Sequence, residues 1–424
     1  MCIRDRYEME QTLNISGKRQ IEEYGVDRFN EACRSIVLRY TQQWREIVDR
    51  IGRWVDFDNA YRTMDLPYME SIWWVFKQIW DKGLIYEGTK SMPYCPRCAT
   101  PLSNFEVQQN YVEVEDPALT ARFRALDLKD TYFLAWTTTP WTLPSNMALA
   151  VGPDIEYVKV RGKTSTAVYI LAASRLGEYF PDPSCLEVLE RLPGKALRGM
   201  RYEPLFPYFA HLAEKGAFRV YEADFVDVEE GTGIVHIAPG FGEVDHELAI
   251  KEGIPVVCPV DAEGRFTEEV SDYAGVFVKE ADESIMDRLT REGKILEKER
   301  IRHNYPHCWR CDSALIFKAI STWFLKIGPI KEDMIRANKQ INWVPAHIKE
   351  GRFGKWLEGA RDWAISRNRY WGTPLPIWRC SCGEVRCLGS VKELEELTGR
   401  SFSDIHKHFV DAVTFPCSSC GKPM

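Results

Sequence analysis

Two short cysteine pairs, far apart in the sequence, constrain the fold of this chain more than any other feature. Each has the spacing Cys-x-x-Cys, with Cys95 and Cys98 in the first pair and Cys308 and Cys311 in the second. One turn of this kind offers two thiolates, and a structural zinc ion takes four ligands. If the pairs complete one site, the chain leaves and re-enters a body at a single point, and residues 99–307 form an inserted module.

A second group of cysteines lies near the end of the sequence. Cys380 and Cys382 are separated by one residue, whereas Cys417 and Cys420 are separated by two. Paired cysteines in a long chain with strong helical patterns indicate metal binding in a reducing compartment rather than a disulfide framework. We therefore expect two structural zinc ions, the second in a site of less regular spacing.

The composition is typical of a folded protein with two or three domains. The 424 residues are 45% hydrophobic and carry a formal net charge of −7. An acidic chain is poorly suited to coating nucleic acid without specificity, although this leaves room for a local RNA-binding face. No run approaches the roughly 20 apolar residues of a membrane helix. We expect a cytoplasmic protein with no membrane partner.

Hydrophobic periodicity predicts helices on both sides of a β-rich insert. Apolar residues recur at helical spacing from Val26 to Ile51, and a second helix is expected from Pro67 to Lys82, ending at Gly83. Beyond the first cysteine pair the pattern is that of short strands, until a helix is expected over 282–291. The clearest strand candidates are 132–136, 157–160 and 168–171.

The most distinctive string in the insert is WTTTPWTLPSN, at residues 136–146. Three consecutive threonines place hydroxyls on both faces of a strand, and the two prolines force the backbone out of the ladder. Alternate hydroxyls among Thr137, Thr138 and Thr139 could therefore line a pocket at the end of the strand. Taken alone, the string also fits an edge strand whose threonines merely suit β geometry.

A second string, GTGIVHIAPGFGEVDH, occupies residues 231–246. Its glycines indicate tight turns or a close approach of the backbone to another group. His236 lies on a strand-like segment, and Asp245 follows the glycine-rich turn where a helix is expected to begin. A carboxylate there can face a cationic amine. The alternatives are a buried structural imidazole for His236 and a helix cap or surface acid for Asp245.

A third string, DWAISRNRYWGTPLPIW, lies outside the insert at residues 362–378. Arg367 and Arg369, with Asn368 between them, could meet phosphates, because guanidinium groups match phosphate oxygens. Trp371 could form the wall of an apolar pocket. Arginine interleaved with aromatic residues is equally common on an ordinary protein surface.

Together these strings resemble the isoleucyl-tRNA synthetases, a family of class I aminoacyl-tRNA synthetases, from Tyr7 to Met424. The threonine string is the mark of this family, because the valyl and leucyl relatives carry Arg-Pro in place of Thr139-Pro140. The other two strings recur in the family, and the cysteine groups resemble those of a subgroup with two structural zincs. The resemblance implies a monomeric enzyme that attaches isoleucine to tRNA(Ile) at the expense of ATP.

The same resemblance implies that the insert is an editing domain. Isoleucine and valine differ by one methylene, which a binding pocket distinguishes too weakly for translation, so valyl-tRNA(Ile) is hydrolysed at a second site. In the family, residues matching Thr137, Thr138 and Thr139 line that pocket. Asp245 would hold the α-ammonium group of valine, and His236 would lie beside the terminal adenosine and exclude isoleucine. A water assisted by a ribose hydroxyl attacks the ester, so no protein nucleophile is implied.

The resemblance also implies that the synthetic site is only partly present. Trp371 matches the wall of the isoleucine pocket, and residues 367–369 match a segment near the aminoacyl-adenylate. The two signatures that bind ATP with Mg would precede Tyr7 and follow Met424, and the anticodon-binding domain would also lie outside. We therefore expect a fragment that does not activate isoleucine alone.

The expected fold class is α/β, with a partial Rossmann-like catalytic domain and a β-rich editing domain inserted on a zinc-bound stalk. The expected boundaries are 1–6 for a start that does not match the family, 7–94 for the first part of the catalytic domain, 95–115 and 300–320 for the stalk, 116–299 for the editing domain, and 321–424 for the second part of the catalytic domain, with a zinc knuckle at 379–424.

Two other interpretations are open at this stage. A noncatalytic zinc-ribbon module that binds RNA would explain the cysteines and the locally basic stretch between Lys349 and Arg369, but would give the threonine and glycine strings no role. A valyl-type or leucyl-type synthetase fragment is closer, and the run Pro140–Pro144 argues against it.

Overall fold

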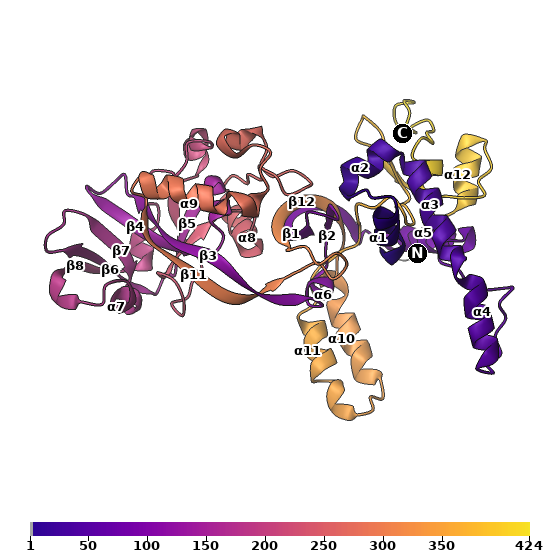
Figure 1. Cartoon of the computed structure of the whole chain (residues 1–424), viewed down its shortest axis with the longest axis horizontal. Coiled ribbons are helices and arrows are strands. Elements are labelled where there is room, and N and C mark those ends of the chain that lie inside the picture. The colour runs from indigo at the N-terminus through magenta and orange to yellow at the C-terminus, as the bar shows by residue number, and fades with distance from the viewer. Residues whose placement is uncertain (1–2) are drawn as a thin grey trace. The chain divides into compact units, whose positions relative to one another are not determined.

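The computed structural model describes residues 3–424, so Met1 and Cys2 of the expected non-family start lie outside the described residues. The chain forms two compact units (Figure 1). The inserted unit is Thr89–Ile320, and the body unit comprises the residues up to Gly88 together with Ser321–Met424. The organisation is mixed α/β, as the sequence predicts.

The inserted unit is built on a nine-stranded sheet in the order β8-β6-β7-β4-β10-β5-β9, with β3 pairing β4 and β11 pairing β3. Strand β4 pairs in parallel with both β7 and β10 and antiparallel with β3. The strand bounds are β3 Tyr111–Arg124, β4 Thr131–Thr137, β5 Ala148–Val151, β6 Glu156–Gly162, β7 Val168–Ala172, β8 Leu186–Pro193, β9 Arg219–Glu222, β10 Ile234–Ile237 and β11 Ile295–Pro306.

Strand β4 is covered on both faces, which explains its nearly continuous apolar sequence. Phe133 and Ala135 point into the main core of the unit. Leu134 points the other way and packs with Val158 and Leu171 in a smaller core. The strand candidates 132–136, 157–160 and 168–171 are thus confirmed within β4, β6 and β7.

Strands β3 and β11 form a long antiparallel ribbon (Figure 1), and Cys308 follows two residues after the end of β11. Its register runs from Ala121 opposite Ile295 to Tyr111 opposite Pro306. The ribbon therefore returns the second cysteine turn to the place where the first one began. The chain enters the inserted unit in β1 (Ile85–Cys95) and leaves it in β12 (Ile316–Leu325); the short β2 (Thr100–Pro101) pairs with the end of β1.

Short helices complete the inserted unit. The helix expected over 282–291 is confirmed as α9, Asp282–Arg291. The others are α6 Asn104–Val107, α7 Leu176–Tyr179 and α8 Glu243–Glu252, with 3-10 turns η1 Pro140–Ser145, η2 Ala173–Arg175, η3 Pro183–Cys185, η4 Gly194–Leu197, η5 Ala210–Lys215, η6 Glu268–Tyr273 and η7 Val278–Ala281.

The body unit begins with helices, and one of them differs from the sequence prediction. The helix expected from Val26 to Ile51 is interrupted at Tyr40, giving α3 (Val26–Arg39) and α4 (Thr41–Arg50). The periodicity continues through both, but α3 packs into a buried cluster through Phe29 and Cys33, whereas no side chain of α4 that the structure describes is buried. In α4 the side chains of Trp44 and Ile47 remain 63% and 53% exposed.

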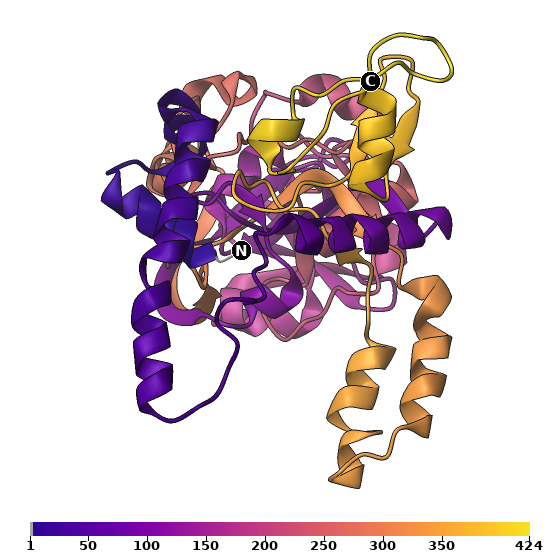
Figure 2. The same cartoon turned by 90° about the vertical axis from the view of Figure 1, so that its right-hand side faces the viewer.

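The helix expected from Pro67 to Lys82 is confirmed as α5, Leu66–Asp81, with Pro67 in its first turn and Gly83 just beyond its end in a left-handed conformation. Helices α10 and α11 lie side by side (Figures 1 and 2). The remaining elements of this unit are α1 Ile3–Thr12, α2 Gly17–Tyr24, η8 Gly328–Ile330, α10 Lys331–Gln340, η9 Ala346–Ile348, α11 Arg352–Glu358, β13 Trp363–Ala364, β14 Ile377–Arg379, β15 Val385–Cys387, α12 Val391–Thr398 and α13 Lys407–Val410.

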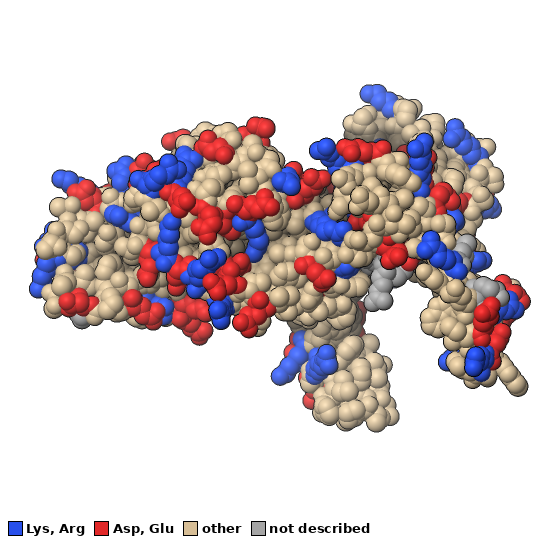
Figure 3. Space-filling view, viewed as in Figure 1, with Lys and Arg blue, Asp and Glu red and all other residues tan. Residues whose placement is uncertain are grey.

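Two further observations concern the surface. Acidic and basic side chains are interspersed on the face of the molecule shown in Figure 3, in keeping with the modest net charge of −7. Within residues 3–424, no helix combines the length and the apolar content needed to cross a membrane.

Candidate active site

The threonine string and the glycine string meet at one pocket of the inserted unit. The pocket has a volume of about 310 Å³. It lies where β4 and β10 end, so residues about 100 positions apart in the sequence face the same space. Its lining consists of Trp136, Thr137, Thr138, Thr139, Thr142, Phe225, Asp227, Glu230, Gly231, Thr232, Gly233, Ile234, Val235, His236, Ala238, Phe241 and Asp245.

The three consecutive threonines all reach this pocket, and not only alternate ones as the strand pattern suggested. The reason is that β4 ends at Thr137, and the chain then turns into η1. The turn is held by short-range contacts: Thr139 N–H donates to Oγ1 of Thr137 (3.2 Å), and the Thr139 hydroxyl lies 3.3 Å from that of Thr142. The pocket thus presents a row of hydroxyl groups.

His236 is held in one neutral form by a chain of hydrogen bonds. The Asn146 amide donates to Nδ1 of His236 (2.8 Å), and its orientation is set because its Oδ1 accepts from the Tyr202 hydroxyl (2.7 Å). The hydrogen of the neutral ring is therefore on Nε2, which donates to Oγ1 of Thr142 (3.0 Å). Burial lowers the pKa of His236 to about 3. This imidazole has no free lone pair with which to accept a proton.

Asp245 is in the opposite electrostatic situation. It lies in the first turn of α8 and faces the pocket. Its Oδ2 accepts a hydrogen bond from the backbone N–H of Ala238 (2.8 Å). Burial raises the pKa of Asp245 to about 6, and backbone hydrogen bonds only partly offset this effect. The carboxyl is therefore ionised near neutral pH but poorly solvated, which favours binding of a cationic group.

The glycine-rich turn before α8 has little room for side chains. A Cβ atom on Gly242 would lie 2.6–2.9 Å from the carboxyl atoms of Asp245, and one on Gly240 would lie 2.1 Å from the carbonyl oxygen of Val257. The turn is also tied to the strands by which the chain enters and leaves the unit. Buried His246 contacts the carbonyl of Thr89 (3.1 Å), and Ala319 N–H donates to the carbonyl of Gly240 (2.6 Å).

The buried carboxyl of Asp282 also stabilises the turn that follows the threonines. Trp141 lies in the first turn of η1, where backbone N–H groups have no partner within the helix, and Asp282 accepts its hydrogen (2.8 Å). Asp282 is only 7% exposed, and burial raises its pKa to about 7.

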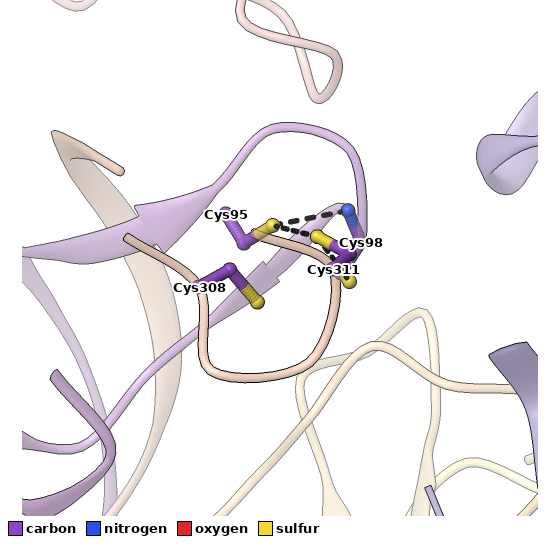
Figure 4. Close-up of side chains that lie close together, drawn as sticks. All are labelled: Cys95, Cys98, Cys308 and Cys311. Atoms are coloured by element: carbon purple, nitrogen blue, oxygen red, sulfur yellow. Dashed lines mark hydrogen bonds between the residues drawn. The ribbon is translucent and has the colours of Figure 1, made fainter. Parts of the chain in front are cut away.

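The first cysteine group converges as its spacing predicted (Figure 4). The four sulfur atoms of Cys95, Cys98, Cys308 and Cys311 lie within 4.8 Å of one another. The Sγ atoms of Cys95 and Cys98 are 3.5 and 3.6 Å from that of Cys311, far beyond a disulfide bond. Four thiolates around a tetrahedral metal at about 2.3 Å would be roughly 3.8 Å apart, so the group fits a metal ion.

The second cysteine group converges in the same way despite its irregular spacing. Sulfur atoms are 3.4 Å apart between Cys380 and Cys420 and 3.7 Å apart between Cys382 and Cys417, and all four lie within 4.8 Å. This group belongs to the body unit. It too has the donor set and the spacing of a metal site.

The third string belongs to the body unit, and some of its side chains already form contacts within that unit. Nη1 of Arg367 donates to the carbonyls of Ala364 (2.9 Å) and Ser366 (2.8 Å). Asn368 is exposed and Arg369 half-buried. Trp371 is buried, and its ring stacks on that of His406 at 4.3 Å. These four residues belong to a different unit from the threonine pocket.

The sequence prediction omitted three residues that hold the pocket together. Thr142 and Asn146 are part of the threonine string, but their partner His236 is about 90 residues away. Tyr202 lies in no string at all and is buried. The signal that could have identified the first two is the polarity of Thr142 and Asn146 in a buried, proline-rich turn.

Comparison with known proteins extends over most of the chain. A family profile described as tRNA synthetases class I (I, L, M and V) matches residues 3–419. Among similar curated proteins, isoleucine–tRNA ligase of Treponema denticola is 53% identical, covering 98% of this chain and 41% of that protein. The isoleucine–tRNA ligase of Protochlamydia amoebophila is 54% identical, covering 96% of this chain and 39% of that protein.

The chain thus spans about two-fifths of the length of these relatives. Among solved structures, the editing domain of the Plasmodium falciparum cytosolic leucyl-tRNA synthetase is 8% identical with a TM-score of 0.35, covering 42% of this chain and 98% of that one. That overall likeness is weak. The match to the family profile is decisive: the chain belongs to the class I tRNA synthetases of the isoleucine, leucine, methionine and valine group.

Proposed function

We propose that this chain is part of an isoleucine–tRNA ligase and that its inserted unit hydrolyses valyl-tRNA(Ile). The threonine pocket supports this proposal most directly, because it combines a row of hydroxyls with the half-buried carboxylate of Asp245. The relatives that are 53–54% identical over nearly the whole chain are named isoleucine–tRNA ligases. Their name favours the isoleucine enzyme over the valyl and leucyl alternatives.

In this proposal Asp245 binds the α-ammonium group of the misattached valine. A cation beside this carboxylate would replace the water that burial removes, and would favour its charged form. Thr137, Thr138 and Thr139 orient the ester and the terminal ribose through their hydroxyls. Positioning of this kind can supply a large share of a rate enhancement without covalent participation of the protein.

The water that attacks the ester must then lose its proton to a group other than His236. That imidazole is neutral, and both of its nitrogens are committed to Asn146 and Thr142. In this proposal a hydroxyl of the terminal ribose orients the water, and the proton ends on the ribose oxygen that is released from the ester. His236 acts instead as a fixed wall beside the terminal adenosine and limits the size of the side chain that enters.

We further propose that each cysteine group holds one zinc ion, with a structural role. Four thiolates in tetrahedral spacing are typical of structural zinc, and such a site leaves no open coordination position for chemistry. In the whole enzyme, the body unit would take part in ATP-dependent attachment of isoleucine to tRNA(Ile). Trp371 and residues 367–369 are our candidates for contacts with isoleucine and its adenylate.

The test is deacylation by this chain of valyl-tRNA(Ile) and of isoleucyl-tRNA(Ile), each compared with the Asp245→Ala variant. We expect faster hydrolysis of the valyl ester. Losing a carboxylate that pairs with a desolvated cation costs about 2–5 kcal/mol, so hydrolysis by the variant should fall at least about 30-fold. Unchanged hydrolysis by the variant would remove Asp245 from the site, and RNA binding without any hydrolysis would favour the zinc-ribbon alternative.

A further inference from the structure

One wall of the threonine pocket is an irregular segment, residues 223–233, which we call the rim loop. It connects β9 to β10 and contains no helix or strand. Its backbone carbonyls therefore need partners outside regular structure. The rim-loop residues that line the pocket are Phe225, Asp227, Glu230, Gly231, Thr232 and Gly233.

The two ends of the rim loop are fixed by the sheet. Ala223 N–H donates to the carbonyl of Val151 (2.9 Å) at the start of the loop. At its end, the Thr232 hydroxyl donates to the carbonyl of Leu134 (2.6 Å), and Ala172 N–H donates to the carbonyl of Thr232 (2.9 Å). Residues of the stretch between these anchors line the pocket.

Between the anchors, Val226 packs into the main core, and one guanidinium group binds three backbone carbonyls. Nε of Arg175 donates to the carbonyl of Gly231 (2.8 Å), and Nη1 donates to those of Glu229 (3.0 Å) and Val228 (3.5 Å). The side chain is 14% exposed, and Nη2 pairs with Glu178. The planar, permanently charged guanidinium can bind several carbonyls at once with little loss of freedom, whereas a lysine ammonium cannot reproduce the fork.

The position of Gly231 makes this contact consequential for the pocket. Gly231 adopts a left-handed conformation with φ of 64°, and a Cβ atom there would lie 3.2 Å from Cβ of Trp136. The loop therefore packs directly on β4, one residue before the threonines. A small displacement of the loop would widen the pocket next to the place where the aminoacyl group must fit.

We propose that Arg175 is a positioning residue for the hydrolytic reaction, which holds the rim loop against β4 and so sets the shape of the pocket. The proposal rests on the function proposed above for this pocket. Arg175 lies in η2, after β7, and in none of the three sequence strings. Its role follows from the three carbonyls that converge on it.

The test compares Arg175→Ala and Arg175→Lys with Arg161→Ala in the full chain. Arg161, in β6, is a matched control. Its Nη2 also pairs with a carboxylate, that of Glu187 in β8 (2.6 Å), but both side chains are exposed. Three quantities are measured: kcat and KM for valyl-tRNA(Ile) and isoleucyl-tRNA(Ile), amide hydrogen exchange of the peptides that cover 223–233, and the thermal midpoint of unfolding.

We expect Arg175→Ala to exchange faster in the rim loop and to lose up to about 10²-fold in kcat/KM for the valyl ester, since misplacement by about 1 Å can cost that much. Discrimination against the isoleucyl ester should fall as well. Arg175→Lys should be intermediate, added guanidinium ion should restore part of the activity of Arg175→Ala, and Arg161→Ala should match the parent chain.

Normal exchange in 223–233 together with unchanged kcat, KM and discrimination in Arg175→Ala would overturn the proposal. If that variant unfolds, Arg175→Lys supplies the same comparison with the charge retained. If the parent chain hydrolyses neither ester, the proposed function fails. Hydrogen exchange then still decides whether Arg175 holds the loop.

Discussion

Burial acts on two titratable residues of the pocket in opposite directions. It lowers the pKa of His236 to about 3 and raises that of Asp245 to about 6. The first residue is therefore uncharged throughout the physiological range, and the second changes charge just below it. His236 therefore stays neutral, and the carboxylate of Asp245 favours a cation beside it.

Hydrolysis of valyl-tRNA(Ile) should accordingly depend on pH through Asp245. As the pH falls through about 6, the free carboxyl becomes protonated and no longer attracts the α-ammonium group. We expect kcat/KM to decline in this range, because it reports the free enzyme, and kcat to decline at lower pH, because the bound cation keeps the carboxylate charged. Asp245→Asn should be slow and show no such decline. A decline of equal size in Asp245→Asn would assign it to another group.

Asp282 gives a second pH dependence, in stability. Burial raises its pKa from 3.8 to about 7, so the unfolded chain loses this proton at lower pH than the folded chain. The free energy of unfolding should therefore fall as the pH rises from about 4 to 7. Asp282→Asn keeps an acceptor for Trp141 N–H without the charge, and should be more stable than the parent above pH 7, by on the order of 3 kcal/mol.

Denaturant unfolding at pH 5 and pH 8 measures this difference. Asp287→Asn is the matched control, because Asp287 lies on the same helix and its side chain is 70% exposed, 3.3 Å from Lys298. The control should track the parent at both pH values. Equal stability of the parent and Asp282→Asn at pH 8 would contradict the assignment.

At the scale of single residues, the sequence predicted which side chains meet better than how they are held. The threonine run and the glycines around His236 and Asp245 marked these residues in the sequence, and in the structure they line one pocket. Tyr202 and Arg175 carry no such mark. Their roles arise from partners 56 and 53–56 positions away, which no local pattern encodes.

At the scale of secondary structure, the glycine-rich turn before α8 determines where the carboxylate of Asp245 lies. Gly242 is in an extended conformation, with φ of −130°, so a side chain there causes no backbone strain. Its conflict is steric, since a methyl group would lie 2.6 Å from Cγ of Asp245. The turn and the carboxylate therefore depend on each other.

Gly242→Ala should displace the carboxylate and lower kcat/KM for valyl-tRNA(Ile) by about 10- to 100-fold, with a fold close to that of the parent. Gly177→Ala is the control, because no atom lies within 4 Å of a Cβ built at that glycine. Circular dichroism and deacylation kinetics of both variants provide the check. Full activity in Gly242→Ala would show that the carboxylate position tolerates the methyl group.

Secondary structure itself was predictable where pattern and packing agree. Helix α5 matches its prediction because periodicity, Pro67 and Gly83 point to the same bounds, and α9 matches through its periodicity. The break at Tyr40 was not predictable, because the apolar periodicity runs through it. Only tertiary packing separates the buried face of α3 from the exposed face of α4.

At the scale of the whole molecule, each of the two units contains one cysteine group. One joins the first and last segments of the inserted unit, and the other closes the end of the body unit. The convergence of all eight sulfur atoms was predictable from their spacing. The order of the nine strands β3 to β11 in their sheet was not predictable, because strand pairing over such distances leaves little trace in the sequence.

Metal analysis of the purified chain should find about two zinc ions. Cys95→Ser and Cys417→Ser should each retain about one, because serine replaces a thiolate ligand with a far weaker one. Cys185→Ser, at an exposed cysteine outside both groups, should retain two. Removal of zinc by a chelator should also lower the thermal midpoint. One zinc in the parent chain would mean that only one group binds metal, and none would refute both sites.

The central claim is that the threonine pocket of the inserted unit binds the terminal adenosine of tRNA together with the amino acid attached to it. Its most direct test is binding of adenosine that carries valine through a non-hydrolysable amide, followed by amide hydrogen exchange. We expect protection in 136–142 and 225–245, and weaker binding by Asp245→Asn. Binding that protects other segments, or that is unchanged in Asp245→Asn, would contradict the account.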